Sequence, residues 1–513
     1  MDQPQLQTFM FSCLIITISL LLFKWLNNKP TAERNLPPSP PRLPILGNLH
    51  HLKHGLRHRS LESLARKHGG PLMLLHLGRV HLLVVSSADA AREILRTHDL
   101  SFVNRPILKA AKKLLYNGKN VSTAPYGEYW RQVRSIFVLQ LLSNKRVQSF
   151  RSIREEETQL FMKRIQESSC GPLNLTKMFS EFAYDEICRS AFGRKYGESE
   201  SGKKFMMLLS ECMELLGTIG IAGTVPWLSW ITRFNGFDKR VDEVFQGLDG
   251  FLEGLIQEHM METTNGNDDV FPKDKSEENF LDILLQYQKE NTSGDSIDRD
   301  SIKALILDVF VAGTDTISTV LEWVLTELLR HPIVMEKLQN EVMEIAKGRE
   351  GITDLDLEKM HYMKAVIKET LRYHPPIPIL VPRIAGEDLK VNGYDVKAGT
   401  VVMINVYAIG RDTASWDEPE KFMPERFLNR SVDFKGLDFE LIPFGSGRRG
   451  CPGITFGVAT VEILLANLMH KYNWELPGLQ YGAKGKEDMD MTEAAGVTVR
   501  RVVPLLAVAT PRK

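Results

Sequence analysis

The stretch that decides the fold is Pro443-Phe444-Gly445-Ser446-Gly447-Arg448-Arg449-Gly450-Cys451-Pro452-Gly453, in the last part of a 513-residue chain. It lies between a strand-like segment, 439–444, and an apolar segment of helical pattern, 453–472. Its glycines superficially match the G-x-G-x-x-G fingerprint of dinucleotide-binding proteins. That fold needs a second parallel strand with an acid roughly twenty residues on, and then further strand–helix units. No such strand follows here, so we reject a dinucleotide site.

Cys451 is the reactive group of this stretch. It lies at the start of the helical segment, among glycines and beside Arg448 and Arg449. Positive charge and a helix N-terminus both favour the thiolate over the thiol, and a thiolate is a nucleophile or a metal ligand. No histidine lies within six residues, which leaves open a partner from elsewhere in the chain. The residue chemistry slightly favours the metal ligand.

The longest helical run extends from a cap at Asp298 or Asp300 to Pro332, which ends it. Its centre is apolar except for Asp308, so we expect a helix buried around most of its circumference. Gly313-Thr314-Asp315-Thr316 lies in this buried part. Two interpretations are equally supported. One is a kinked core helix whose hydroxyls bond back one turn, and the other is a site where a carboxyl and a hydroxyl deliver protons.

Glu369 and Arg372 form a second cluster. At i, i+3 they share one helix face and can form an ion pair, which by default we place on the surface. Arg426, in the segment Pro424-Glu425-Arg426-Phe427, is a candidate second arginine for the same carboxylate. The sequence alone does not show that the two segments meet.

The composition is that of an ordinary globular protein, with 43% apolar and 25% charged residues. Lys plus Arg and Asp plus Glu both number 64, so bulk charge does not favour a nucleic-acid partner. Five scattered cysteines argue against a disulfide framework and a zinc–thiolate site. Helical patterns dominate, with strands expected over 73–87 and around Asn392-Gly393 within 389–406. The predicted fold class is mainly α with small β-sheets.

The N-terminus carries an uncharged apolar segment, 6–23, which as a helix is roughly 27 Å long and can span a thin bilayer. A signal peptide is disfavoured because no basic cluster precedes the segment and no small-residue cleavage site follows it, and a buried core helix is the other alternative. Lys24, Lys29 and Arg34 follow the segment and place the rest of the chain in the cytosol. We predict a membrane anchor over 1–26, a proline-rich hinge over 27–44 and one catalytic domain over 45–513.

Four motifs in a fixed order resemble those of the cytochromes P450. They are Ala312-Gly313-x-Asp315-Thr316 (oxygen activation), Glu369-x-x-Arg372 (K-helix pair), Pro424-Glu425-Arg426-Phe427 (meander) and Phe444-x-x-Gly447-x-Arg449-x-Cys451-x-Gly453 (haem binding). Their spelling is most similar to that of the A-type plant microsomal P450s, the clan numbered 71. With the anchor and hinge, the resemblance covers nearly the whole chain. It implies a cytochrome P450 fold preceded by one transmembrane helix.

The resemblance also assigns roles to residues. Cys451 would be the axial ligand of the iron in haem b, and Thr316 with Asp315 would deliver protons during oxygen activation. Glu369, Arg372 and Arg426 would form the family's structural triad. The residues implied to bind haem, in part through charge-assisted hydrogen bonds to its propionates, are Trp130, Arg134, Arg383, Phe444, Arg449, Cys451 and Gly453. Without the resemblance, Trp130 and Arg134 fit an amphipathic helix surface equally well.

Substrate contacts are implied by position. They are the helix face of Leu305, Val309, Ala312 and Thr316, the loop around 104–122, the segment 215–234, Ile379-Leu380-Val381 and Ala494-Ala495. These positions are mostly apolar, so we expect a small lipophilic substrate. Trp227 and Trp230, within 219–231, fit either core packing or a lip dipped into the bilayer.

The resemblance therefore implies a monooxygenase at the endoplasmic reticulum membrane that oxidises a specialised metabolite of terpenoid, phenylpropanoid or alkaloid type. Electrons would come from NADPH through NADPH-cytochrome P450 reductase, because the chain has no credible flavin or nicotinamide site. One alternative is an enzyme of the same fold that catalyses oxidative rearrangement, coupling or dehydration. Another is a membrane-tethered haem protein that only binds or senses, against which Asp315 and Thr316 argue.

Overall fold

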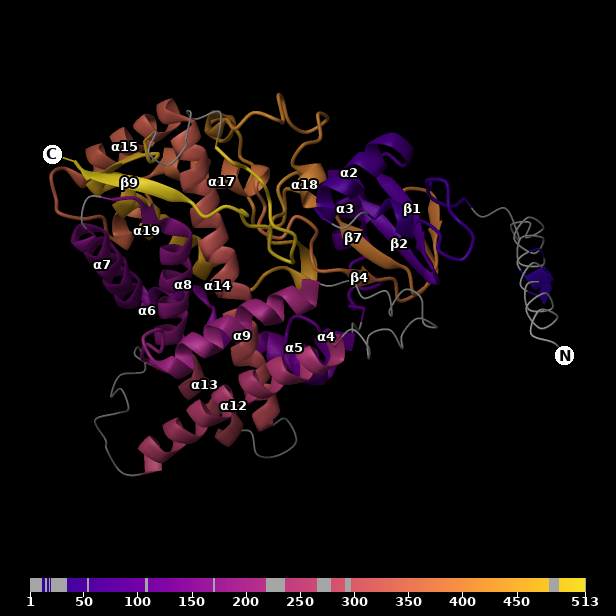
Figure 1. Ribbon diagram of the computed structural model, residues 1–513, viewed down its shortest axis with the longest axis horizontal. Coiled ribbons are helices and arrows are strands. Elements are labelled where there is room, and N and C mark those ends of the chain that lie inside the picture. The colour runs from indigo at the N-terminus through magenta and orange to yellow at the C-terminus, as the bar shows by residue number, and fades with distance from the viewer. Residues whose placement is uncertain are drawn as a thin grey trace, which may run out of the picture.

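The computed structural model describes residues 35–512 except for 53–54, 107–108, 169–170, 218–235, 265–277, 291–296 and 479–488, together with residues 12, 13, 16, 17 and 19. Most of the predicted anchor helix, 6–23, and the segment 219–231 lie outside the described residues, so both stay predictions. The described chain is mainly helical with small β-sheets, which confirms the predicted fold class (Figure 1).

The long helices gather at one end of the molecule, on the left in Figure 1. The α-helices are α2 (Arg57–His68), α3 (Ala88–Arg92), α4 (Lys109–Leu114), α5 (Glu128–Ser135), α6 (Asn144–Ser149), α7 (Arg151–Glu167), α8 (Leu175–Phe192), α9 (Glu200–Gly217), α12 (Phe237–Thr264), α13 (Phe280–Glu290), α14 (Arg299–Arg330), α15 (Pro332–Ala346), α16 (Asp354–Leu357), α17 (His361–Tyr373), α18 (Val406–Ile409) and α19 (Ile454–Lys471). Short helical turns of other types are η1 (Leu49–His51), η2 (Glu93–Thr97), η3 (Tyr116–Gly118), η4 (Ile136–Leu141), η6 (Pro424–Phe427) and η7 (Gly447–Arg449).

The sheets are small, and the largest lies at the other end of the molecule (Figure 1). The strands are β1 (Leu72–Leu77), β2 (Val80–Val85), β3 (Leu173–Asn174), β4 (Arg383–Ile384), β5 (Leu389–Val391), β6 (Tyr394–Val396), β7 (Val401–Ile404), β8 (Tyr472–Glu475) and β9 (Leu506–Pro511). They form sheets of order β1-β2-β7-β4, β3-β9-β8 and β5-β6. The predicted hairpin at Asn392-Gly393 is confirmed as β5–β6, but 389–406 holds a third strand, β7, which pairs in parallel with β2.

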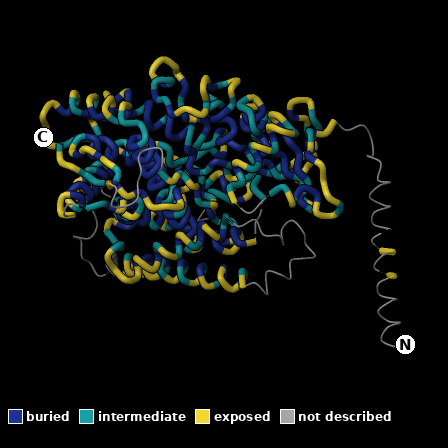
Figure 2. The backbone as a smooth tube through the Cα atoms, turned by 45° about the horizontal axis from the view of Figure 1, so that its top comes forward, coloured by how far each residue is buried: buried dark blue, intermediate teal, exposed yellow. Residues whose placement is uncertain are grey.

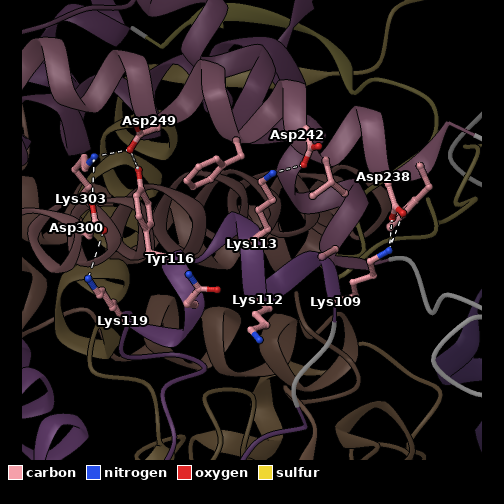
Figure 3. A pocket seen from close by; sticks show the side chains of 15 residues that line it. Lys109, Lys112, Lys113, Tyr116, Lys119, Asp238, Asp242, Asp249, Asp300 and Lys303 are labelled. Atoms are coloured by element: carbon pink, nitrogen blue, oxygen red, sulfur yellow. Dashed lines mark hydrogen bonds and ion pairs between the residues drawn. The ribbon is translucent and has the colours of Figure 1, made fainter. Parts of the chain in front are cut away.

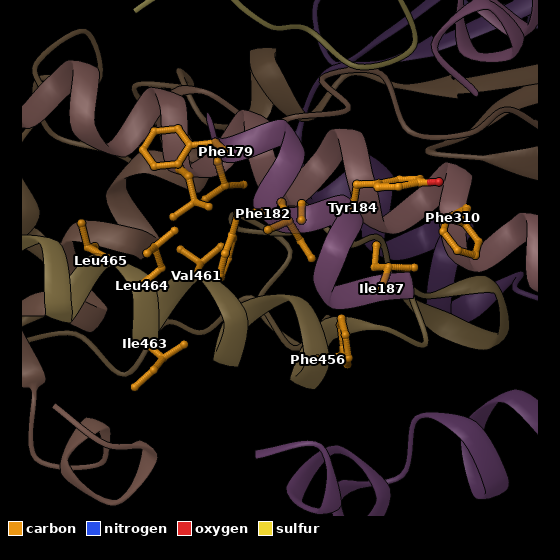
Figure 4. Close-up of a cluster of buried hydrophobic side chains, with 14 of the residues drawn as sticks. Phe179, Phe182, Tyr184, Ile187, Phe310, Phe456, Val461, Ile463, Leu464 and Leu465 are labelled. Carbon is orange, nitrogen blue, oxygen red and sulfur yellow. The ribbon is translucent and has the colours of Figure 1, made fainter. Parts of the chain in front are cut away.

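Helix α14 forms the centre of the core. It begins at the predicted cap, where the Asp298 carboxylate accepts from the Ser301 N–H at 2.9 Å, and it ends before Pro332. Figure 4 shows Phe310 of α14 among aromatic and aliphatic side chains of α8 and α19, such as Ile187 and Phe456. Among the described residues α14 is also long and apolar enough to cross a membrane, but most of it is buried inside the protein. Figure 2 shows that the buried residues of the described chain gather in its interior and the exposed ones at its edges.

The segment 439–444, which the sequence predicted to be strand-like, forms turns. The Leu441 N–H donates to the Asp438 carbonyl and the Gly445 N–H to the Ile442 carbonyl, at 2.9 and 3.0 Å. Phe439 and Ile442 are buried against the β1-β2-β7-β4 sheet, so their apolar character reflects packing and not strand pairing. The strand prediction was therefore wrong.

The described part of the predicted hinge lies against the large sheet. The Leu74 N–H donates to the Pro38 carbonyl at 2.8 Å, and the Asn48 side chain donates to the Pro40 carbonyl at 3.1 Å. Asn35 contacts the smaller β5–β6 sheet, where its backbone N–H donates to the Asp395 carboxylate at 2.8 Å. Residues 35–44 are thus fixed to the catalytic body, and the hinge and domain boundaries stay predictions.

Candidate active site

Cys451 lies in a tight loop between η7 and α19. Its N–H donates to the Phe444 carbonyl at 2.9 Å, and the Gly450 N–H donates to the Gly447 carbonyl at 2.9 Å. Gly447 has a φ of +70°, and a Cβ there would lie 2.5 Å from the Leu95 carbonyl oxygen. This position therefore requires glycine, because any side chain would be strained by the positive φ and would clash with the Leu95 carbonyl.

The surroundings of the Cys451 thiol raise its pKa above the usual value. Burial raises its pKa, while a hydrogen bond from the Gly453 backbone and the charge of Arg134 lower it less. Arg448, which the sequence placed beside the thiol, is exposed and pairs with Asp99 at 3.4 Å. Arg134 and the Gly453 N–H thus favour the thiolate, in the direction that the sequence indicated, but burial outweighs them. A bound metal cation deprotonates such a thiol outright.

Arg134 and Arg383 bind the backbone of the same loop. The Arg134 guanidinium donates to the Gly450 carbonyl at 2.7 Å, and that of Arg383 donates to the Ser446 carbonyl at 2.8 Å. Arg383 also forms an ion pair with Asp99 at 3.1 Å. Two of the arginines that the resemblance assigned to haem binding thus converge, from distant segments, on the loop that carries Cys451.

Arg449 is the most strongly held arginine of the cluster. Its guanidinium lies 4.3 Å from the centre of the Trp130 ring, a cation–π distance. It donates to three backbone carbonyls, those of Val103 at 2.9 Å, Val121 at 3.2 Å and Ala124 at 2.5 Å. Trp130 shares one of them, because its indole N–H donates to the Val121 carbonyl at 3.1 Å.

The exposed centre of α14 lies within an otherwise buried helix. Ala312 is exposed, Val309, Asp315 and Thr316 are partly exposed, and Leu305 is fully buried one turn earlier. The Thr316 hydroxyl donates to the Ala312 carbonyl at 2.5 Å, the back-bond expected for a threonine in a core helix. Burial raises the pKa of Asp315, and the charge of Arg500 opposes that shift. The Thr316 back-bond fits the interpretation as a core helix, and the partial exposure of Asp315 and Thr316 fits the interpretation as a proton-delivery site.

Glu369, Arg372 and Arg426 meet, and they meet in the core. Arg372 donates to both carboxylate oxygens of Glu369, at 2.7 and 2.8 Å, and Arg426 donates to one of them at 3.1 Å. Glu369 and Arg372 are fully buried, so the surface location expected for this pair is wrong. The reason is that Arg372 also donates to the carbonyls of Gly410, Pro419 and Lys421, which lie far along the chain.

Comparison with known proteins decides the family. The family model described as Cytochrome P450 matches residues 37–494. The chain is a cytochrome P450. It is 56% identical to cytochrome P450 71A8 of Mentha piperita over 99% of this chain and 97% of that protein. It is 49% identical to the tabersonine/lochnericine 19-hydroxylase of Catharanthus roseus over 94% of each chain. A zebrafish P450 structure with progesterone shares 25% identity at a TM-score of 0.73, covering 89% of this chain and all of that one.

A cytochrome P450 contains haem, and this P450 offers the charges that haem requires. Burial, together with the charges of neighbouring arginines, lowers the pKa of Arg449 to about 10, so the cluster carries surplus positive charge. Arg105, which the sequence analysis did not single out, belongs to it, because burial and the charges of Arg383 and Arg449 lower its pKa. Its buried Nε has no hydrogen-bond partner among the described residues. Two propionates would supply the missing negative charge and acceptors, so the residues present fit the cofactor.

Asp308, the acid that stood out in the apolar run of α14, holds a loop of this P450 in place. Its carboxylate accepts from the N–H groups of Val121 and Ser122 at 2.7 and 3.0 Å, and from the Asn120 amide at 2.8 Å. The Ser122 hydroxyl adds a fourth bond at 3.0 Å. These four bonds satisfy the buried carboxylate of Asp308. They also fix the loop 120–122, whose Val121 carbonyl accepts from Trp130 and Arg449.

Two of the segments that the resemblance assigned to substrate contact lie near residues described above. Leu380 Cδ1 would lie 3.7 Å from a Cβ at Gly445, so 379–380 reaches the Cys451 loop. Ala494 lies in a hairpin, where its N–H donates to the Arg500 carbonyl at 2.7 Å. Arg500 in turn is the charge felt by Asp315 of α14. The two segments therefore approach the Cys451 loop and α14 respectively.

A separate cavity of about 580 Å³ lies between α4, η3, α12 and the start of α14 (Figure 3). Lysines and aspartates line it in pairs, such as Lys109 with Asp238 at 2.7 Å and Lys303 with Asp249 at 2.5 Å. Five lysines face four aspartates in this lining, so most of the charges are paired and the net charge of the cavity is small. Cys451 is not among its lining residues, so it is distinct from the centre described above.

Proposed function

We propose that this P450 inserts one oxygen atom of O2 into a C–H or C=C bond of a small lipophilic specialised metabolite, of terpenoid, phenylpropanoid or alkaloid type. Its electrons come from NADPH through a separate membrane-bound flavoprotein reductase. The observation that carries the proposal is the exposed centre of α14, where Thr316 and Asp315 lie on an otherwise buried helix of a haem protein.

In this proposal Cys451 would ligate the haem iron through its thiolate, and the arginine cluster would bind the propionates. When bound, haem supplies the iron at which O2 is reduced and cleaved. Arg134, Arg383 and Arg449 neutralise the propionates, with Trp130 packed on Arg449, and the unpartnered Nε of Arg105 is a further donor. Phe444 and Gly453 hold the Cys451 loop, through the Phe444 carbonyl and the Gly453 N–H.

Asp315 and Thr316 supply protons. The raised pKa of the Asp315 carboxyl brings its protonated form closer to neutral pH, so it can hold and release a proton during turnover. The Thr316 hydroxyl donates a hydrogen bond to the Ala312 carbonyl, so its oxygen remains able to accept a hydrogen bond from another donor. The two residues are consecutive on α14, so their side chains leave the helix in different directions; in this proposal each delivers a proton to the same site, and together they are the proton relay.

The substrate pocket is apolar. We assign its walls to Val309 and Ala312 of α14, to Ile379 and Leu380, and to Ala494, with Leu305 as a buried support one turn earlier. Lipophilic substrates favour such a surface because their burial is driven by the hydrophobic effect. Similarity to an enzyme named for hydroxylating tabersonine supports a metabolite of comparable size and polarity.

We place the protein in the endoplasmic reticulum membrane as a single-pass protein with a cytosolic catalytic domain. The uncharged segment 6–23 supports this placement, as do the basic residues that follow it. Ile16, one of the few described residues there, is helical and 57% exposed, as a lipid-facing side chain would be.

The test has two stages. The ferrous protein with carbon monoxide should show the strongly red-shifted Soret band of thiolate-ligated haem, and a normal imidazole-type spectrum would refute the assignment of Cys451. Lipophilic plant metabolites are then screened for a substrate-induced spin shift. Hits are incubated with NADPH and reductase, and the products are identified. Consumption of NADPH with every hit but no oxygenated product would refute the monooxygenase.

A further inference from the structure

Two side chains in the first turn of α2 bind Glu493, which lies far from this helix in sequence. Glu493 immediately precedes Ala494, and its carboxylate accepts from His58 at 2.9 Å and from Arg59 at 2.7 and 2.8 Å. His58 is 2% and Glu493 8% exposed, so this contact is inside the protein. A carboxylate bound by a bidentate arginine and an imidazole is fixed in both position and orientation.

Glu493 lies at the base of a hairpin, where the two strands pair. The hairpin closes where Glu493 pairs with Arg501 and the Val502 N–H donates to the Thr492 carbonyl at 2.9 Å. On its other strand the Val499 N–H donates to the Pro376 carbonyl at 2.8 Å. The hairpin, 492–502, is thus held on one side by the α2 side chains and on the other by the segment that leads to 379–380.

The same turn of α2 also holds segment 379–380. The His58 carbonyl accepts from the side-chain amide of Asn405, which is fully buried, at 2.9 Å. Asn405 pairs with Ile379 in an isolated β-bridge, and the Leu380 N–H donates to the Ile404 carbonyl at 3.0 Å. Figure 1 shows α2 beside α18, which begins at the residue after Asn405. His58 therefore bonds to one wall through its imidazole and to the other through its carbonyl.

We propose that Glu493, His58 and Arg59 form a clamp that sets the distance between the hairpin 492–502 and segment 379–380, and thereby the size of ligand that the P450 pocket accepts. The inference rests on the proposed function for the identity of these segments as pocket walls. Glu493 is a positioning residue, because it acts through Ala494 and does not itself face the Cys451 loop. Non-directional apolar contacts do not fix a wall to a fraction of an ångström, whereas a bidentate arginine together with a buried imidazole, both bound to one buried carboxylate, does.

The clamp is tested with two iron-binding azoles of different size on the full-length holoprotein. The probes are 4-phenylimidazole, which is small, and clotrimazole, which must contact the distant walls. The variants are E493Q, which keeps the shape of the side chain, and R59Q, whose side chain is 47% exposed and tolerates change. The control is D490N, which removes a carboxylate from the base of the same hairpin, where Asp490 accepts from the Thr492 N–H at 2.7 Å and has no part in the α2 contact.

We expect E493Q and R59Q to weaken clotrimazole binding roughly fivefold or more, with 4-phenylimidazole changed less than about twofold. Hydrogen exchange should become faster in peptides that cover 492–502 and 376–380, but not in β1 and β2, and D490N should match wild type. Equal effects on both azoles, or unchanged exchange in the two segments, would overturn the clamp while leaving the proposed function intact. A wild-type protein that binds neither azole and lacks the thiolate spectrum would overturn the proposed function and the clamp together.

Discussion

Glu186 gives this protein a measurable dependence of stability on pH. It lies on α8, is fully buried, and receives one hydrogen bond, from the Thr460 hydroxyl of α19 at 2.8 Å. Its second oxygen, Oε2, has no hydrogen-bond partner among the described residues. Burial raises the pKa of Glu186 to about 8, against an opposing effect of the Arg154 charge. The folded protein therefore holds this carboxyl as the neutral acid at neutral pH.

The sign and size follow from linkage. The folded pKa lies above the unfolded value of about 4.5, so between the two the folded state binds one more proton and stability falls as pH rises. Each pH unit costs about 1.4 kcal/mol, which gives a loss of about 3 kcal/mol between about pH 5.5 and pH 8. At about 2.1 cal/mol/K of unfolding entropy per residue, a chain of 513 residues loses about 3 °C in Tm.

The substitution Glu186→Gln should remove this loss, because the amide has the shape of the neutral acid and still accepts from Thr460. The Tm of the variant relative to that of wild type should rise by about 3 °C between pH 5.5 and pH 8, followed as thermal loss of the carbon monoxide-binding form. E243Q, on an exposed side chain of α12, is the matched control and should show no pH-dependent difference. A Glu186→Gln variant that is less stable than wild type at pH 8 would show that the folded protein holds Glu186 as a stabilised carboxylate, and the reasoning would fail.

Three further substitutions test the assigned roles. Thr316→Ala should keep the thiolate spectrum but divert NADPH equivalents to hydrogen peroxide, measured as product formed per NADPH; unchanged coupling would refute the relay. Arg372→Lys cannot form both bonds to Glu369, and breaking a buried pair costs about 3–5 kcal/mol, so little carbon monoxide-binding protein should accumulate, whereas normal yield would contradict the structural role. Arg105→Gln removes one charged donor worth about 1.5–3 kcal/mol, so haem should transfer to apomyoglobin roughly tenfold faster or more, and an unchanged rate would exclude Arg105 from the propionates.

Local patterns in the sequence predicted much of the fold. The cap at Asp298 and the stop at Pro332 depend on the backbone of adjacent residues alone, and α14 has these ends. The turn at Asn392-Gly393 needs positive φ at both residues, and both have it. The segment 439–444 was misassigned because its buried phenylalanine and isoleucine serve packing, which an apolar pattern does not distinguish from strand pairing.

The candidate site was less predictable because its contacts join distant segments. The spacing of Glu369 and Arg372 shows a shared helix face, but their burial depends on carbonyls at 410–421. Arg105 was missed because two features of the folded protein single it out. It lies near Arg383 and Arg449, which are distant in sequence, and its buried Nε has no hydrogen-bond partner among the described residues. The available signal was one arginine in segment 104–122, which also carries four lysines, and such a pattern does not distinguish a buried ligand-binding residue from a solvated one.

Carboxylates outside the proposed chemistry hold the loops of this site. Asp308 accepts from the loop 120–122 at four points, Glu369 accepts from the Met423 N–H at 2.7 Å as well as from two arginines, and Glu493 joins the hairpin to α2. Each of these acids is buried, so each bond forms in a medium of low dielectric where it is strong and directional. The apolar side chains of the walls contribute burial but little orientation. A change of wall side chain should therefore alter which substrate fits, while a change of one of these acids should alter where the whole wall lies.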